Sequence, residues 1–226
     1  MDKRTWIIFG VAVVAILAGL VAFSRKDSVD VSNVDNTKIQ TEASAASGIA
    51  DHVFGKKDSK VVLIEYGDFQ CPGCGTFHRN FEPLMDSYKD KITFVFRNFP
   101  ITSIHPNARA AAATAEAAGQ QGKYWEMWNL LYNQQDNWNN LGIEDRDAKF
   151  KSFATELNLN MTQFDKDVAS DKVAKKITYD QSLGKANGVT GTPTLFLNGK
   201  ILATDQYNST ETIRTTLDAA LKQAGM

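Results

Sequence analysis

The sequence has only two cysteines among its 226 residues, Cys71 and Cys74, and they are three positions apart. A disulfide between such close positions cannot hold distant parts of a fold together, so a disulfide-stabilised framework is excluded. Charge of one sign is also lacking, because 25 basic and 26 acidic side chains leave a net charge of −1. We therefore expect no binding to nucleic acid. The remaining composition, 43% apolar and 23% charged, is typical of a globular protein.

The long apolar run of the sequence lies at its amino terminus, where residues 6–23 include no charged side chain. As a helix this run would be about 27 Å long, close to the hydrocarbon thickness of a bilayer. We therefore predict a membrane anchor over residues 1–26. Positive charges flank the run on both sides and give only a slight preference for a cytoplasmic amino terminus. A cleaved signal peptide is the alternative, although residues 19–23 offer no small-x-small cleavage site.

Residues 27–47 are rich in Ser, Asp, Asn, Thr and Ala and include no aromatic residue. Such a segment buries too little apolar surface to offset the entropy lost on ordering. The sequence therefore predicts a flexible tether over residues 27–47, followed by a folded domain over residues 48–226.

The folded domain begins with the pattern strand, helix, strand. Residues 61–66, Val-Val-Leu-Ile-Glu-Tyr, predict a buried central strand that is interrupted only by Glu65. Apolar residues then recur at helical spacing from Cys74 to Leu84, so the Cys-Pro-Gly-Cys segment opens a helix. Residues 91–99 alternate and are rich in aromatic and β-branched side chains, which predicts a second strand.

A helical block of about eighty residues follows, over residues 106–187, in which no strand pattern occurs. Residues 194–197 and 200–203 then predict a hairpin around Asn198-Gly199. The chain ends in a predicted helix that Asn208 would cap, with Glu211 three residues later as in a capping box. The expected order is β-α-β, helices, β-β-α.

The cysteine pair can perform redox chemistry at the start of its helix. Cys71 lies in the first turn, where unpaired backbone N–H groups stabilise a thiolate and can lower the pKa to roughly 3.5 to 7.5. Cys74 lies one turn further on the apolar stripe, where it is shielded and close enough to attack a mixed disulfide on Cys71. A metal-binding module is the alternative of another class, since His78 follows Cys74 by four residues and could complete a site.

Two motifs connect these features to a known family. Residues 65–74 read Glu-Tyr-Gly-Asp-Phe-Gln-Cys-Pro-Gly-Cys, and residues 191–194, just before the hairpin, read Gly-Thr-Pro-Thr. With the helical block between them, they resemble the DsbA-type thiol–disulfide oxidoreductases of the thioredoxin superfamily. The resemblance covers about residues 52–224 and implies an α/β, thioredoxin-like fold with an inserted helical subdomain.

The resemblance also implies roles for particular residues. Pro193 would be cis and face the cysteine pair, so that the backbone of Thr192 can pair with an extended substrate chain. Glu65 would be a buried acid behind the cysteines, and its raised pKa would suit it to shuttle the proton of Cys74. No cofactor or resident metal is expected.

These expectations together describe a single-pass protein of the cell membrane whose catalytic domain lies outside the cytoplasm. It would introduce disulfides into unfolded or reduced exported proteins through Cys71 and Cys74, and a quinone-linked membrane partner would reoxidise it. Strongly oxidising members of the family have a histidine between the cysteines, where this chain has Pro-Gly. The direction of exchange therefore stays open, and a disulfide reductase or isomerase is the nearest alternative. An inert adhesion or scaffold domain is a more distant one.

Overall fold

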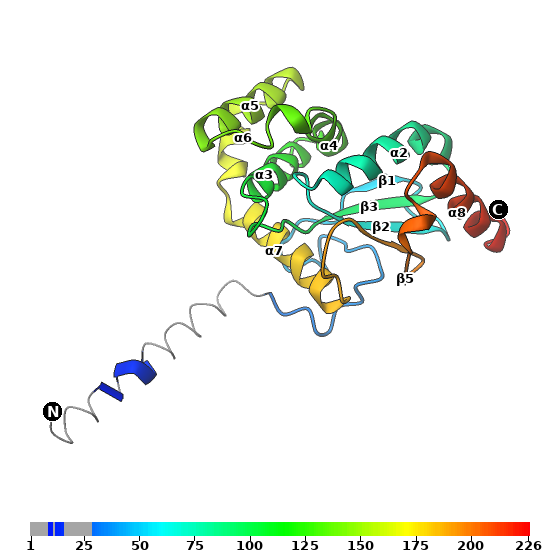
Figure 1. Cartoon of the computed structure of the whole chain (residues 1–226), viewed down its shortest axis with the longest axis horizontal. Coiled ribbons are helices and arrows are strands. Elements are labelled where there is room, and N and C mark those ends of the chain that lie inside the picture. Colours follow the sequence, from blue (N-terminus) through cyan, green and yellow to red (C-terminus); the bar gives the residue numbers. More distant parts are fainter. Residues whose placement is uncertain (1–8, 11, 16–28) are drawn as a thin grey trace.

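The computed structural model describes residues 9–10, 12–15 and 29–226 (Figure 1). A five-stranded sheet in the order β1-β3-β2-β4-β5 forms the centre of the domain. β2 runs parallel to β3, whereas β1 with β3, β2 with β4 and β4 with β5 are antiparallel. The strands are β1 (Val53–Gly55), β2 (Val62–Gly67), β3 (Thr93–Asn98), β4 (Thr194–Leu197) and β5 (Lys200–Ile201).

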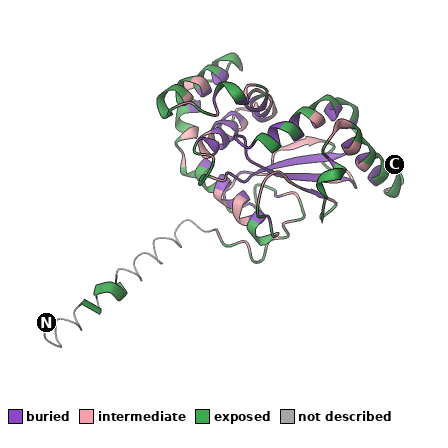
Figure 2. Ribbon diagram, viewed as in Figure 1, coloured by how far each residue is buried: buried purple, intermediate pink, exposed green. Residues whose placement is uncertain are grey.

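Helices cover both faces of this sheet, and Figure 2 shows the central strands β2 and β3 buried between them. Side chains alternate along β2, so Leu63 packs on one face and Ile64 on the other. The face of Leu63 is covered by α2, α4 and α8, and the face of Ile64 by α7. The helices are α2 (Pro72–Tyr88), α3 (Ala108–Gly119), α4 (Tyr124–Asn133), α5 (Ile143–Glu156), α6 (Met161–Val168), α7 (Asp171–Ala186) and α8 (Thr210–Gln223), with short 3-10 turns η1 (Gln135–Asn137) and η2 (Thr204–Gln206).

The helical insertion between β3 and β4 is the predicted block, now resolved into α3 to α7, of which α3 to α6 lie together at one end of the sheet (Figure 1). The α/β fold with an inserted helical subdomain is thus confirmed. Within this block Asn160 caps the short helix α6, because its side chain accepts a hydrogen bond from the backbone N–H of Gln163 at 3.0 Å.

The hairpin and the last helix follow the prediction with two differences. Asn198 and Gly199 have φ values of 50° and 77°, the two left-handed residues that a type I′ turn requires. β5 nevertheless ends at Ile201, so the second hairpin strand is shorter than expected. The predicted cap of the last helix is wrong by one residue, because Ser209 Oγ accepts the backbone N–H of Thr212 at 3.2 Å.

The segment over residues 29–51, called the N-terminal segment below, lies against the domain. Its carbonyl groups at Asn36 and Lys38 each accept a hydrogen bond of 2.6 Å from the guanidinium of Arg97, which is fully buried on β3. Its carboxylate at Asp51 forms an ion pair with the same guanidinium at 2.8 Å. The prediction of a free tether is therefore wrong for residues 29–47, and residues 27 and 28 lie outside the described part of the chain.

The predicted membrane anchor falls on residues 1–26, most of which lie outside the described residues. Within residues 9–10, 12–15 and 29–226, no helix combines the length and the apolar character needed to span a bilayer.

Candidate active site

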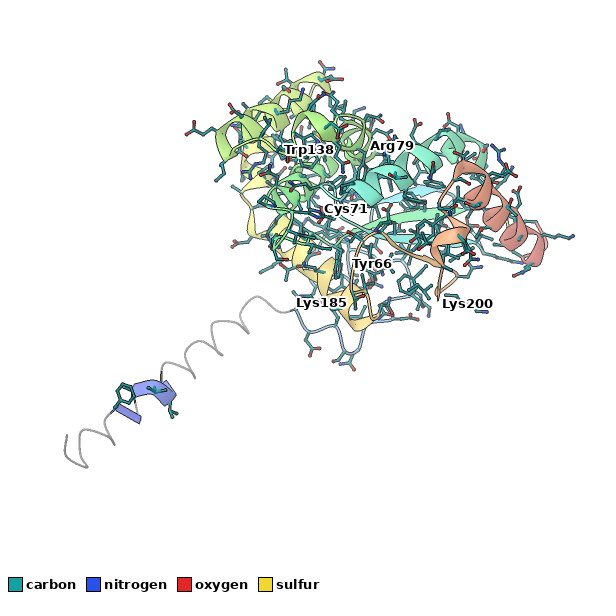
Figure 3. The ribbon with its side chains drawn as sticks, viewed as in Figure 1. Tyr66, Cys71, Arg79, Trp138, Lys185 and Lys200 are labelled. Carbon is teal, nitrogen blue, oxygen red and sulfur yellow. The ribbon has the colours of Figure 1, made fainter. Side chains whose placement is uncertain are left out.

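Cys71 lies at the entrance of α2, where it is the N-cap residue and Pro72 begins the first turn (Figure 3). Cys71 is 8% exposed, and in its protonated form the thiol donates a hydrogen bond of 3.3 Å to the carbonyl oxygen of Thr192. The Thr192–Pro193 peptide bond is cis, as predicted. A Cβ atom at residue 73 would lie 3.1 Å from Pro193 Cδ. Glycine at this position therefore lets the start of α2 approach the Thr192–Pro193 segment closely.

The environment of Cys71 favours its thiolate. A hydrogen bond from the side chain of Cys74 is the largest cause that lowers the pKa of Cys71, and the backbone N–H groups of Gly73 and Cys74 add to it. Burial acts in the opposite direction, yet the pKa falls from 9.0 to about 5. Cys71 is therefore a thiolate at neutral pH, and the side chain of the second cysteine is the largest single cause.

Cys74 has the opposite environment. Its side chain is fully buried, and this burial raises its pKa well above 9.0. The backbone N–H of Asp68 donates a hydrogen bond of 3.4 Å to Cys74 Sγ. Both thiols are free, so the structure describes the dithiol form of the pair.

Glu65 lies behind the two cysteines, on the same face of β2 as Leu63. Its side chain is fully buried between the neighbouring strands, where it is paired with Phe96 and Leu195. Neither carboxyl oxygen has a hydrogen-bond partner of ordinary length among the described residues. Burial, and secondly the negative charge of Cys71, raise the pKa of Glu65 well above 4.5. The predicted position and the direction of its pKa shift are both confirmed.

Two glutamines that the sequence did not single out hold the turn in front of α2. Gln70 accepts the backbone N–H of Asn107 at 2.7 Å through Oε1. Gln135, in η1, donates through Nε2 to the carbonyl oxygens of Phe69 at 2.7 Å and Cys71 at 3.0 Å. Gln135 gave no signal in the sequence, because it is far from the cysteines along the chain and only the insertion brings it there.

The alternative of a metal site at Cys71, Cys74 and His78 is wrong. His78 Nε2 pairs with Asn129 Oδ1 at 2.9 Å, and the imidazole ring packs 4.5 Å from the ring of Trp128. Burial lowers the pKa of His78 to about 4, so the ring is a neutral core residue. No group of three His, Cys, Asp or Glu side chains in the described part of the chain could hold a metal ion.

A cavity of about 370 Å³ opens beside Cys71, between α2 and the segment that leads into α8. Pro193 lies at its edge, and the rings of Phe77 and Tyr207 form its apolar part. The other described lining residues are uncharged as well: Gly73, Thr76, Asn80, Thr192, Thr204 and Asn208.

Comparison with known proteins places the chain in a family. The family model described as thioredoxin matches residues 47–219, and the chain therefore belongs to the thioredoxin family. Its fold is that of α-DsbA1 from Wolbachia pipientis, with 24% identity, a TM-score of 0.65 and coverage of 77% of this chain and 92% of that one. Oxidised BdbD from Bacillus subtilis is similar, with 20% identity, a TM-score of 0.63 and coverage of 76% and 93%. The resemblance to DsbA-type proteins is thus confirmed for the fold.

A curated relative extends beyond this domain. The Na(+)/H(+) antiporter NhaA 1 of Salinispora arenicola is 38% identical over 150 residues, which are 66% of this chain and 22% of the antiporter. The chain thus spans about a fifth of the length of that relative.

Proposed function

We propose that this chain is a thiol–disulfide oxidoreductase that exchanges disulfides with other proteins through Cys71 and Cys74. The observation that carries the proposal is the opposite shift of two thiol pKa values within one helical turn. The pKa of Cys71 is lowered to about 5, and that of Cys74 is raised well above 9.0. Such a pair separates the sulfur with the low pKa, Cys71, which exchanges with the substrate, from the fully buried resolving sulfur of Cys74.

The direction that this pair supports best is oxidation of the substrate. A substrate thiolate attacks Cys71 Sγ in the Cys71–Cys74 disulfide, and Cys74 leaves and takes a proton from Glu65. A second substrate thiolate then attacks the substrate sulfur of the mixed disulfide, and Cys71 leaves as its stabilised thiolate. The substrate loses two electrons and the enzyme gains them. Stabilisation of the reduced form makes a dithiol pair oxidising, which favours this direction over reduction or isomerisation.

The surface beside Cys71 supports a protein substrate. An extended chain would lie across the Thr192–Pro193 segment, whose Thr192 carbonyl oxygen is 3.3 Å from Cys71 Sγ. The neighbouring cavity, lined by uncharged residues among those described, suits apolar or neutral side chains of an unfolded, reduced exported protein. Sodium–proton exchange is not part of this proposal, because the match covers only 22% of the antiporter.

We further propose that residues 1–26 anchor the domain on the outer side of the cell membrane. The support is the uncharged apolar run over residues 6–23. Each cycle leaves the cysteine pair reduced, so an oxidant must regenerate it, and a quinone-linked membrane protein could supply that oxidising power.

The test uses the full-length chain and a reduced, unfolded protein substrate, with disulfide formation followed by trapping free thiols. With oxidised glutathione supplied as the oxidant, we expect the wild type to speed disulfide formation, Cys71→Ser to be inactive and Cys74→Ser, which cannot form the internal disulfide, to accumulate a mixed disulfide between Cys71 and glutathione. If Cys71→Ser kept the wild-type rate, the proposed function would be wrong. Cleavage of substrate disulfides by the reduced enzyme, faster than their formation, would instead support the reductase alternative.

A further inference from the structure

The backbone of one residue, Asp68, contacts both cysteines of the pair. The backbone N–H of Asp68 donates to Cys74 Sγ at 3.4 Å, and the carbonyl oxygen of Asp68 accepts the backbone N–H of Cys71 at 3.0 Å. The orientation of the Asp68 backbone therefore determines whether its N–H group points at the buried sulfur of Cys74. Such a donor stabilises negative charge on Cys74 and lowers its pKa, against the larger effect of burial.

The side chain of Asp68 is fixed from three directions. Its Oδ1 accepts the backbone N–H of Gln70, and its Oδ2 accepts the backbone N–H of Ile101, each at 2.8 Å. Its Oδ2 also pairs with His105 Nδ1 at 2.8 Å. The carboxylate is fully buried, whereas the His105 side chain is 16% exposed. A buried carboxylate with this set of donors cannot turn without leaving a backbone N–H group unpaired, which is unfavourable in the protein interior.

We propose that Asp68 is a positioning residue for the step in which Cys74 resolves a mixed disulfide, and that His105 holds Asp68 in place. The inference rests on the proposed function. In this step Cys74 gives its proton to Glu65 and its sulfur attacks Cys71 Sγ. The bond between Cys71 and the partner sulfur breaks, and the partner leaves as a thiolate that takes a proton from water. The Asp68 N–H stabilises the charge on Cys74 during the attack.

For Asp68→Asn, the loss of positioning and the loss of a negative charge predict opposite effects on the rate at which Cys74 attacks the mixed disulfide. Removing a buried negative charge near Cys74 would by itself favour its thiolate and speed the attack. Losing the fixed orientation of the backbone N–H would slow the attack. A hydrogen bond to a charged group contributes enough that its loss slows the step by about tenfold. Of these two effects, only lost positioning slows the step.

The experiment mixes the reduced full-length chain with excess oxidised glutathione. Cys71 attacks glutathione disulfide to give a mixed disulfide and one glutathione, and resolution by Cys74 releases a second. Acid quenching and mass measurement follow the two species separately. For Asp68→Asn we expect the mixed disulfide to persist about tenfold longer, while its formation stays within about twofold of wild type. Resolution as fast as wild type, or faster, would overturn the proposal.

Three further variants separate positioning from a general loss of structure. His105→Leu removes the donor to Asp68 and should prolong the mixed disulfide. His105→Asn keeps a donor near the position of Nδ1 and should restore the wild-type lifetime. His52→Leu is the matched control for His105→Leu and should leave the lifetime of the mixed disulfide unchanged, because His52 Nε2 forms an equally short pair with the buried Glu116, at 2.8 Å, and within the described residues His52 makes no hydrogen bond to either cysteine.

If Asp68→Asn does not fold, the two His105 variants decide, and equal lifetimes for them would overturn the proposal. If the wild type forms neither the mixed nor the internal disulfide, the proposed function fails first and the inference falls with it. Failure of the inference alone is distinguishable from failure of the proposed function, because only in the latter case does the wild type not react with oxidised glutathione.

Discussion

The low pKa of Cys71 should appear as the shape of its pH–reactivity profile. A thiol with a pKa of 9.0 is about 1% thiolate at pH 7, whereas one with a pKa of about 5 is about 99% thiolate. The reactive form is therefore about 100-fold more abundant at neutral pH than for an ordinary cysteine. Its reactivity should rise through about pH 5 and stay flat from about pH 6 to 9.

The rate at a single pH does not test this reasoning. Thiolate nucleophilicity falls with pKa, with a Brønsted slope of about 0.4–0.5, so a drop of about four pKa units weakens each thiolate roughly 40- to 100-fold. This loss nearly cancels the gain in thiolate abundance at pH 7. The pH at the midpoint of the pH–reactivity profile does not depend on thiolate nucleophilicity, so this midpoint is the quantity to measure.

The assay is alkylation of the reduced full-length chain between pH 3 and 10, with thiolate absorbance as a second reading. Cys74 is buried with a raised pKa and should not react in this range. Cys74→Ala removes the largest cause of the low pKa, so its midpoint should move up toward 9. A wild-type midpoint near 9, or a midpoint that Cys74→Ala leaves in place, would refute the reasoning.

The lowered pKa of Cys71 also makes the stability of the folded protein depend on pH. The folded pKa of Cys71 lies below its unfolded value, so the native state of the reduced protein gains stability as pH rises from about 5 to 9 and loses it as pH falls through 5. At pH 7, two units above the folded pKa, the effect corresponds to about 2.7 kcal/mol, which solvent screening near the protein surface reduces to about 1–2 kcal/mol. Urea unfolding of the reduced wild type and Cys71→Ser at several pH values measures it, and a difference independent of pH would contradict it.

Three other predictions concern the buried polar groups. Glu65→Leu removes an unpaired carboxyl and should raise the free energy of unfolding by about 1–3 kcal/mol, while slowing resolution of the mixed disulfide by about 100-fold; unchanged resolution would exclude Glu65 as the proton acceptor. Arg97→Met removes one of the two ion-pair partners of the buried Asp51 and leaves only Lys176, at 3.0 Å, so it should cost up to about 3–5 kcal/mol in urea unfolding, part of which Asp51→Asn in the same chain should restore. Deleting residues 1–47 removes two carbonyl acceptors of Arg97 and should lower the unfolding midpoint, whereas deleting residues 1–28 should not; equal midpoints would mean that the N-terminal segment contributes no stability.

Much of the fold and the centre of the site could be predicted because their signals are local. The apolar run around Glu65 identified β2, and the helical spacing after Cys74 identified α2. The turn at Asn198-Gly199 located the hairpin, since only a few residue types adopt two left-handed positions in succession. In each case a few adjacent residues determine the backbone conformation.

The features that the sequence did not reveal depend on contacts between distant residues. The N-terminal segment looked unable to fold because it has few large apolar residues, yet it is held through its own carbonyl groups by Arg97, 59 positions away from Lys38. In the sequence Asp68 fits an ordinary polar turn, and only its contacts with Ile101 and His105 in the structure distinguish it from one. Composition cannot show which backbone carbonyl groups will meet a buried guanidinium.

The measurement that tests the central claim most directly is a redox titration of the full-length chain in glutathione buffers, with its thiols trapped and counted. The account predicts one two-electron transition that requires both Cys71 and Cys74. It also predicts a potential nearer to the −120 mV of a strong oxidant than to the −270 mV of thioredoxin, on the approximate scale for these proteins, because the Cys71 thiolate is stabilised. A chain that keeps two free thiols at every buffer composition would contradict the account.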